Sequence, residues 1–153
     1  MTSPSRDLPR WLVVGSLVLA AAGVLVAGYL TIEHYTASTT LACPDTGVIN
    51  CQKVTSSAQS KVLSIPVALL GLLYFVAMLV ASVPAAWRRT EPAVRYGRLA
   101  FAVVGVGFVV YLVYAELFVL DAICLWCTAV HVLTVALFAV VAFGTATLGN
   151  EPS

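Results

Sequence analysis

The chain has little charge of either sign. Only 10% of its 153 residues are Asp, Glu, Lys or Arg, whereas an ordinary soluble domain has about 25% charged residues. So few charges cannot cover a water-facing surface, and the composition therefore indicates an integral membrane protein. The formal net charge is only +1, which argues against nucleic-acid binding because that function uses a strongly basic surface.

Hydrophobic residues make up 61% of the chain, and the mean hydropathy is +0.99. A bilayer-spanning helix needs about 20 apolar residues, and four stretches qualify: residues 11–32, 65–83, 99–118 and 125–148. The first is longer than the roughly 7–15 apolar residues of a signal peptide. We therefore expect an all-α membrane protein. Its single domain, over residues 1–153, would be a four-helix bundle with a long extracytoplasmic loop between the first two helices.

The positive charges predict how this bundle is oriented, because cytoplasmic loops are rich in Lys and Arg. Six arginines lie in the N-terminal tail and in the connection between the second and third stretches, and two lysines lie in the long loop. The pattern predicts a multi-pass protein of the inner (plasma) membrane with both termini in the cytoplasm and all four cysteines outside it. The residues counted are Arg6, Arg10, Arg88, Arg89, Arg95 and Arg98 on one side and Lys53 and Lys61 on the other.

The cysteines are the first residues that concern chemistry. The extracytoplasmic side is oxidising, so disulfides form there, and sequence proximity favours pairing Cys124 with Cys127 and Cys43 with Cys51. Disulfides that close such short loops stabilise a fold little, which favours a redox role. Cys124 and Cys127 also form a CxxC motif at a predicted helix start, where the helix dipole favours the reactive thiolate.

Other interpretations of the cysteines stay open. A zinc site needs four converging ligands, and because the chain has no second CxxC motif we expect no metal. A four-span structural protein could keep the same cysteines as disulfide staples. A small proton-coupled transporter could also have four spans, but it would not need four cysteines on one side.

Electrons taken up by a dithiol at the membrane need an acceptor, and a quinone is a suitable one. Cys127 lies three residues beyond Cys124, about 4.5 Å deeper in the helix, so it is better placed to meet a lipid-soluble molecule. His131 follows one turn later on the same face and could donate a hydrogen bond or a proton to the quinone, the alternative being a packed histidine. We expect Glu116 and Asp121 to be solvated charges at the helix end.

Three local predictions concern the loop and the second helix. Val54, Ala58 and Val62 recur every four residues, as on one helical face, which predicts a short helix over residues 53–61 lying on the membrane. Pro66 should lie in the first turn of the second helix, where its missing N–H costs nothing. Residues 88–92 should end that helix.

Several motifs together point to a family. Cys43 and the run Cys-Gln-Lys-Val-Thr-Ser-Ser at residues 51–57 are followed by Ile-Pro-Val at residues 65–67 and by Gly71. The run Cys-Leu-Trp-Cys-Thr then occupies residues 124–128. This combination resembles the vitamin K epoxide reductase family, and the resemblance extends from the first helix to the fourth.

The resemblance implies a role for each cysteine pair. Cys43 and Cys51 would be the shuttle pair that meets the partner, Cys124 and Cys127 the pair that reduces a quinone, and Ser57 a residue of the quinone pocket. The chain shows no fused thioredoxin-like domain, so the thiol partner would be a separate extracytoplasmic protein of the thioredoxin fold. Animal members have a tyrosine where this chain has His131, which favours ubiquinone or menaquinone over an epoxide substrate.

Overall fold

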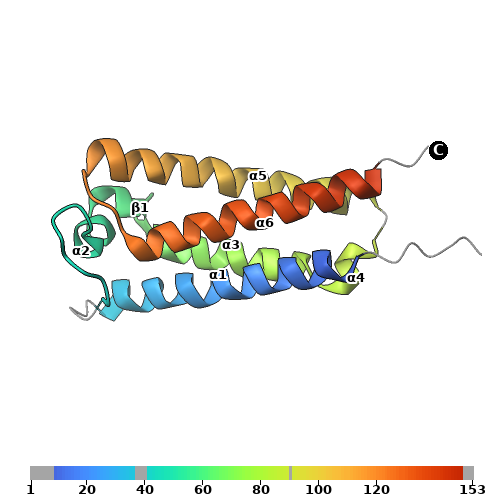
Figure 1. Cartoon of the computed structure of the whole chain (residues 1–153), viewed down its shortest axis with the longest axis horizontal. Coiled ribbons are helices and arrows are strands. Elements are labelled where there is room, and N and C mark those ends of the chain that lie inside the picture. The colour runs from blue at the N-terminus through green and yellow to red at the C-terminus, as the bar shows by residue number, and fades with distance from the viewer. Residues whose placement is uncertain (1–8, 37–40, 90, 150–153) are drawn as a thin grey trace, which may run out of the picture.

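The computed structural model describes residues 9–36, 41–89 and 91–149. Four long helices run alongside one another as a bundle (Figure 1). They are α1 (Arg10–Thr36), α3 (Val67–Ala81), α5 (Pro92–Tyr114) and α6 (Leu125–Gly149), and a π-helical turn, η2 (Ala115–Val119), continues α5. Short elements lie at the two ends of the bundle: α2 (Cys51–Thr55), η1 (Ala58–Ser60), β1 (Lys61–Val62), β2 (Ile65–Pro66) and α4 (Pro84–Trp87).

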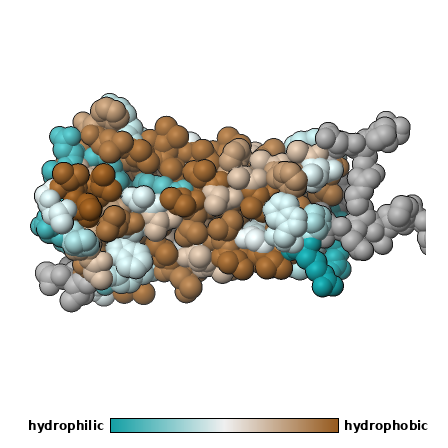
Figure 2. All heavy atoms as spheres, in the orientation of Figure 1, coloured by the Kyte–Doolittle hydropathy of each residue, from teal (hydrophilic) through white to brown (hydrophobic). Residues whose placement is uncertain are grey.

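The outside of the bundle is largely apolar. Hydrophobic side chains cover its middle, and hydrophilic ones gather near its ends (Figure 2). Within the described residues, three helices are long and apolar enough to cross a membrane: Arg10–Thr36, Pro92–Val119 and Leu125–Leu148. The fourth, α3, is apolar but has 15 residues. These helices are typical of an integral membrane protein, and the count of four spans stays a prediction.

Close packing of α1 against α3 forms the centre of the bundle. Small residues on α1, Ala20 and Ala27, lie in one buried cluster with Phe75 of α3 and Leu137 of α6. Gly23 faces the ring of Phe75 so closely that any side chain at this position would overlap the ring. Small residues let helix backbones approach in this way in membranes, where water does not drive the helices together.

A buried arginine marks the end of the bundle remote from the cysteines. Arg98 of α5 is 5% exposed and donates a hydrogen bond to the carbonyl of Ala81, the last residue of α3 (3.1 Å). Its guanidinium lies over the ring of Trp87, 3.4 Å from the centroid, and the Trp87 indole N–H donates to the hydroxyl of Ser16 on α1 (3.3 Å). The cluster thus joins α1, α3, α4 and α5.

The predicted loop helix over residues 53–61 is wrong. The helix α2 begins at Cys51, where the side chain of Asn50 accepts a hydrogen bond from the backbone N–H of Lys53 (2.8 Å), and it ends at Thr55. A 3₁₀ turn and then a strand follow, so Val62 pairs with Ile65 in a hairpin rather than continuing a helical face.

Three predicted helix boundaries are also wrong. The second long helix, α3, ends at Ala81 rather than within residues 88–92. Pro66 lies in β2 and precedes the first residue of α3, because its φ of −59° and ψ of 132° are extended rather than helical. The helix α5 begins at Pro92, seven residues before the predicted start at residue 99. Proline suits the first helical position because its φ is already helical and its missing N–H has no partner there.

Candidate functional site

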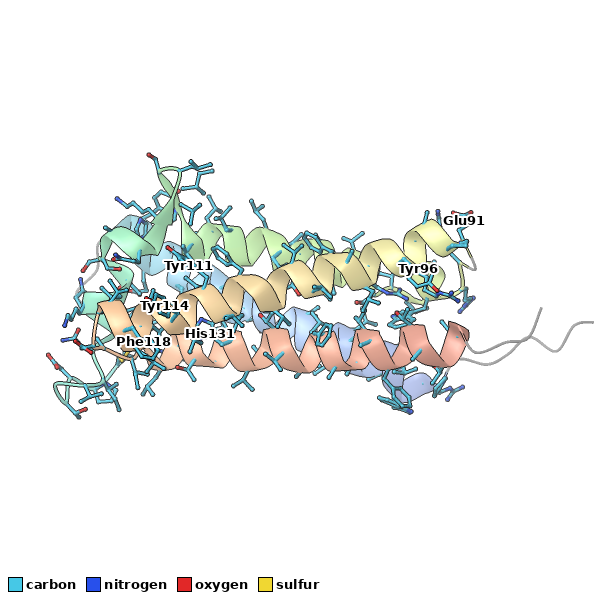
Figure 3. All side chains as sticks on the ribbon, turned by 90° about the horizontal axis from the view of Figure 1, so that it is seen from above. Glu91, Tyr96, Tyr111, Tyr114, Phe118 and His131 are labelled. Carbon is cyan, nitrogen blue, oxygen red and sulfur yellow. A yellow bond between two sulfur atoms is a disulfide. The ribbon has the colours of Figure 1, made fainter. Side chains whose placement is uncertain are left out.

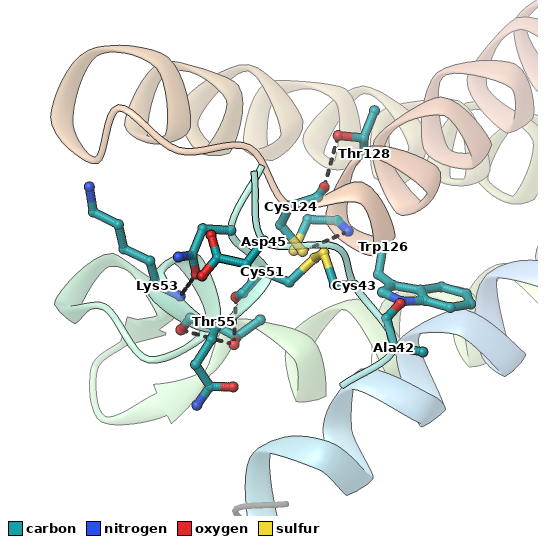
Figure 4. Close-up of a disulfide and its surroundings, with 12 residues drawn as sticks. Ala42, Cys43, Asp45, Cys51, Lys53, Thr55, Cys124, Trp126 and Thr128 are labelled. Atoms are coloured by element: carbon teal, nitrogen blue, oxygen red, sulfur yellow. Dashed lines mark hydrogen bonds between the residues drawn. A yellow bond between two sulfur atoms is a disulfide. The ribbon is translucent and has the colours of Figure 1, made fainter. Parts of the chain in front are cut away.

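All four cysteines lie at one end of the bundle. Cys43 and Cys51 form a disulfide with a Cα–Cα distance of 6.1 Å, as the sequence predicted. Cys51 and Cys124 are 1% and 0% exposed and belong to one buried cluster, against which the half-buried Cys43 and Cys127 pack. Figure 4 shows Cys124 beside the disulfide. Residues separated by 73 positions, Cys51 and Cys124, are thereby brought together.

Cys124 and Cys127 are thiols, so the predicted disulfide between them is not the state described. The backbone N–H of Cys127 donates to Sγ of Cys124 (3.2 Å). A hydrogen bond from the Cys127 thiol lowers the pKa of the Cys124 thiol below its ordinary value, and backbone N–H groups of the same turn act in the same direction, against the effect of burial. The lowered pKa makes Cys124 the thiol of the pair that is more often ionised and the better leaving group.

A short stretch of backbone pairing aligns the loop with the CxxC motif. Ile49 and Ile123 form a parallel bridge, in which the Ile123 N–H donates to the Val48 carbonyl (2.8 Å) and the Asn50 N–H donates to the Ile123 carbonyl (3.0 Å). Ile123 directly precedes Cys124, and Asn50 directly precedes Cys51. The bridge therefore brings the backbone just before Cys51 against the backbone just before Cys124.

An apolar cavity of about 380 Å³ lies beneath the cysteines, bordered by all four long helices and by the segment from Val54 to Ser60. Cys127, Ser57 and His131 all line it, so the structure brings both non-cysteine residues of the predicted site to one space. His131 is 6% exposed, and Figure 3 shows it in the half of the bundle nearer the cysteines. The Ser57 hydroxyl donates to the carbonyl of Val54 (2.7 Å), so its oxygen remains available as an acceptor.

Glu116 also lines this cavity, and the prediction of a solvated charge is wrong for it. Its side chain is 6% exposed, and its carboxylate accepts a hydrogen bond from the backbone N–H of Cys124. Asp121, by contrast, is exposed, as predicted. The spacing along α5 is consistent with this burial. Ala102 and Val109 are buried, and Glu116 follows at the same seven-residue interval, which places it on the same helical face.

A second opening lies on the surface of the cysteine end. It is a crevice of about 260 Å³ bordered by both cysteines of the disulfide. The disulfide thus faces the outside of the bundle through the crevice, whereas Cys127 faces the cavity. The other residues that border the crevice are Leu41, Pro44, Asp45, Asn50 and Gln52.

The described residues include no group of three or more His, Cys, Asp and Glu side chains that could hold a metal ion. Among known proteins, a family model described as "Vitamin K epoxide reductase family" matches residues 14–142. No curated protein matches the chain.

Proposed function

Because the chain belongs to the vitamin K epoxide reductase family, we propose that it is a membrane oxidoreductase that oxidises the thiols of an extracytoplasmic partner and reduces a quinone. Membership of the family indicates thiol–disulfide chemistry in the membrane. The electron path, the partner and the acceptor are the parts that we propose.

One observation carries the proposal: the four cysteines form a continuous path between two openings. Cys43 and Cys51 border the surface crevice, Cys51 and Cys124 lie in one buried cluster, and Cys127 borders the apolar cavity. A path from a protein partner to a lipid-soluble acceptor needs this order. Disulfides that only held a loop in place would not need a thiol at the cavity.

The reaction runs as a series of thiol–disulfide exchanges, in each of which a thiolate attacks a disulfide sulfur. A partner dithiol attacks Cys43, the more exposed sulfur, and leaves oxidised, so that Cys43 and Cys51 become thiols. Cys51 then attacks Cys124 of an oxidised Cys124–Cys127 pair and releases Cys127. Cys43 attacks Cys51, which restores the Cys43–Cys51 disulfide and leaves Cys124 and Cys127 reduced, the combination that the structure has.

The chemistry of the cavity suits a quinone. Small-molecule sites are mostly apolar with a few placed polar groups, and here Ser57, His131 and Glu116 are polar groups among mainly apolar neighbours. Oxidation of one dithiol releases two electrons and two protons, which is what conversion of ubiquinone or menaquinone to the quinol consumes. Ser57 and His131 would hold the quinone by hydrogen bonds, while Glu116 would carry protons near Cys127.

The charges of the two ends support the predicted orientation. Arg10 begins α1, and Arg95 donates to the carbonyl of Leu148 near the end of α6 (3.0 Å), so these arginines lie at the end of the bundle remote from the cysteines. Lys53 and Lys61 lie at the cysteine end. By the charge rule, the cysteines would face outward from the inner (plasma) membrane, and both termini would be cytoplasmic.

The test is to mix the purified protein in lipid with a quinone and a reduced thioredoxin-fold protein. We expect quinol and oxidised substrate to form in equal amounts. A variant with both Cys124 and Cys127 changed to serine keeps the loop disulfide and serves as the matched control, for which we expect no quinol. If the wild-type protein forms no quinol, or if the control forms as much, the proposal is wrong.

A further inference from the structure

The residues that directly precede the two loop cysteines are both hydrogen-bonded to the CxxC segment. Asn50, before Cys51, donates its N–H to the carbonyl of Ile123 (3.0 Å). Ala42, before Cys43, accepts a hydrogen bond from the indole N–H of Trp126 (3.0 Å). Because Trp126 lies between the cysteines of the motif, the backbone just before each shuttle cysteine is tied to the CxxC segment, with which Cys51 exchanges electrons.

Ala42 is held from a second direction as well. Its N–H donates to the hydroxyl of Tyr29 on α1 (3.2 Å), and the rings of Tyr29 and Trp126 are in contact, with centroids 5.0 Å apart. Figure 4 shows the Trp126 side chain beside Ala42. We call Tyr29, Trp126 and the Ala42 backbone the aromatic clamp. Both hydrogen-bonding groups of the Ala42 backbone are therefore held by the clamp.

The two shuttle cysteines differ in what holds them when their disulfide is open. Cys51 begins the helix α2 and is buried, with its neighbour Asn50 in the backbone bridge. Cys43 is followed by exposed residues 44–48 outside any helix or strand, and Gly47 in that stretch has a φ of 85°. Once the disulfide opens, Cys43 keeps its packing against the buried cysteine cluster, and the aromatic clamp holds the residue before it.

We propose that Tyr29 and Trp126 are positioning residues that keep Cys43 within reach of Cys51 while Cys51 is bonded to Cys124. This inference rests on the proposed function. In the step concerned, the Cys43 thiolate attacks Sγ of Cys51, the Cys43–Cys51 bond forms, and the Cys51–Cys124 bond breaks. Cys124 leaves with the electron pair, so the loop pair is oxidised and the CxxC pair is reduced.

The rate of this step depends on how often Cys43 comes close to Cys51. A disulfide forms only when the two Cα atoms are within about 7 Å, and the Cα–Cα distance is 6.1 Å with the clamp in place. A tethered group that is held near its target reacts at a higher effective concentration than one on a loose loop. Loss of the clamp should therefore slow resolution without changing the chemistry of any cysteine.

Two conservative variants test the clamp. Trp126→Phe keeps an aromatic ring but removes the N–H donor, and Tyr29→Phe removes the hydroxyl alone. The enzyme is first incubated with a quinone, which oxidises Cys124 and Cys127 to a disulfide, and is then mixed with reduced thioredoxin-fold substrate and quenched with an alkylating reagent. It is then cleaved in the connection at residues 88–98, which lies between the two linked cysteines, and run on a non-reducing gel. We expect the Cys51–Cys124 link to decay about fivefold more slowly in each variant, the change that loss of one ordinary hydrogen bond gives.

The control is Trp11→Phe, which changes a half-exposed tryptophan that contacts Phe143 at the opposite end of the bundle. It should decay at the wild-type rate, and reduction of the Cys43–Cys51 disulfide by a small dithiol should proceed at the same rate in all variants. Decay at the wild-type rate in both clamp variants, with quinol still formed, would overturn the clamp and leave the proposed function intact. A wild-type protein that forms no quinol would instead overturn the proposed function.

Discussion

One methyl group added at Gly23 tests how closely α1 and α3 must approach to form the cavity. A Cβ at this position overlaps the ring of Phe75, whose side chain is 0% exposed and lines the cavity. Overpacking of a core costs about 1–3 kcal/mol, and the overlap with several ring atoms places Gly23→Ala near the upper end. Alanine regains about 1 kcal/mol of helix propensity over glycine. We therefore expect a net loss of about 2 kcal/mol in the free energy of unfolding.

The same helix supplies a matched control, because a Cβ at Gly15 meets no heavy atom of the described residues within 4 Å. Gly15→Ala should be neutral or should stabilise the protein by up to about 1 kcal/mol. The assay is unfolding of both variants in the same detergent, together with the quinone concentration needed for half-maximal turnover. That concentration should rise for Gly23→Ala only, because Phe75 is pushed toward the cavity. Equal stability of the two variants would refute the packing argument.

Four further predictions concern the site. Cys127→Ser should abolish quinol formation while the Cys43–Cys51 disulfide still exchanges with a dithiol; normal quinol formation would make the CxxC motif a staple. His131→Ala should raise the quinone concentration needed for half-maximal turnover, and an unchanged value would return the residue to a packing role. In intact cells, a membrane-impermeant thiol reagent applied after reduction should label Cys43 faster than Cys51; labelling only in broken cells would reverse the orientation. A hydrogen bond from Cys127 lowers the pKa of Cys124. In the enzyme with an intact Cys43–Cys51 disulfide, the thiolate absorbance should therefore persist to lower pH than in Cys127→Ala; identical pH titrations of the two proteins would contradict this.

Much of the fold and of the site could be predicted from the apolar runs and the cysteine spacing. Four long hydrophobic stretches predicted four helices, and alternating helix directions place the loop cysteines and the CxxC motif at the same end. The pair Cys43 and Cys51 followed from proximity alone. Ser57 was named through family resemblance and His131 because it lies one turn beyond Cys127; both line one cavity, and their binding of a quinone stays a prediction.

Other features depend on contacts that a linear sequence does not display. The hairpin turn is made by two consecutive residues with positive φ, Leu63 and Ser64. Such turns usually contain Gly or Asn at these positions, so the sequence did not predict this one. Glu116 looked like a charge at a helix end because it lies only two residues before residue 118, the end of the predicted third stretch. It is buried at the cavity that Cys127, from a different segment of the chain, also lines.

Because α3 is short, we expect its fit to the membrane to depend on the thickness of the bilayer. Its 15 residues rise about 22 Å at 1.5 Å per residue, less than the hydrocarbon thickness of roughly 30 Å that the longer helices can cross. Arg98 already satisfies the carbonyl of Ala81, so the end of α3 can lie below the headgroups without an unpaired backbone group at that position. Hydrophobic mismatch should therefore affect α3 first. Because α3 is one wall of the apolar cavity, lipids with shorter chains should fit that wall better than lipids with longer ones.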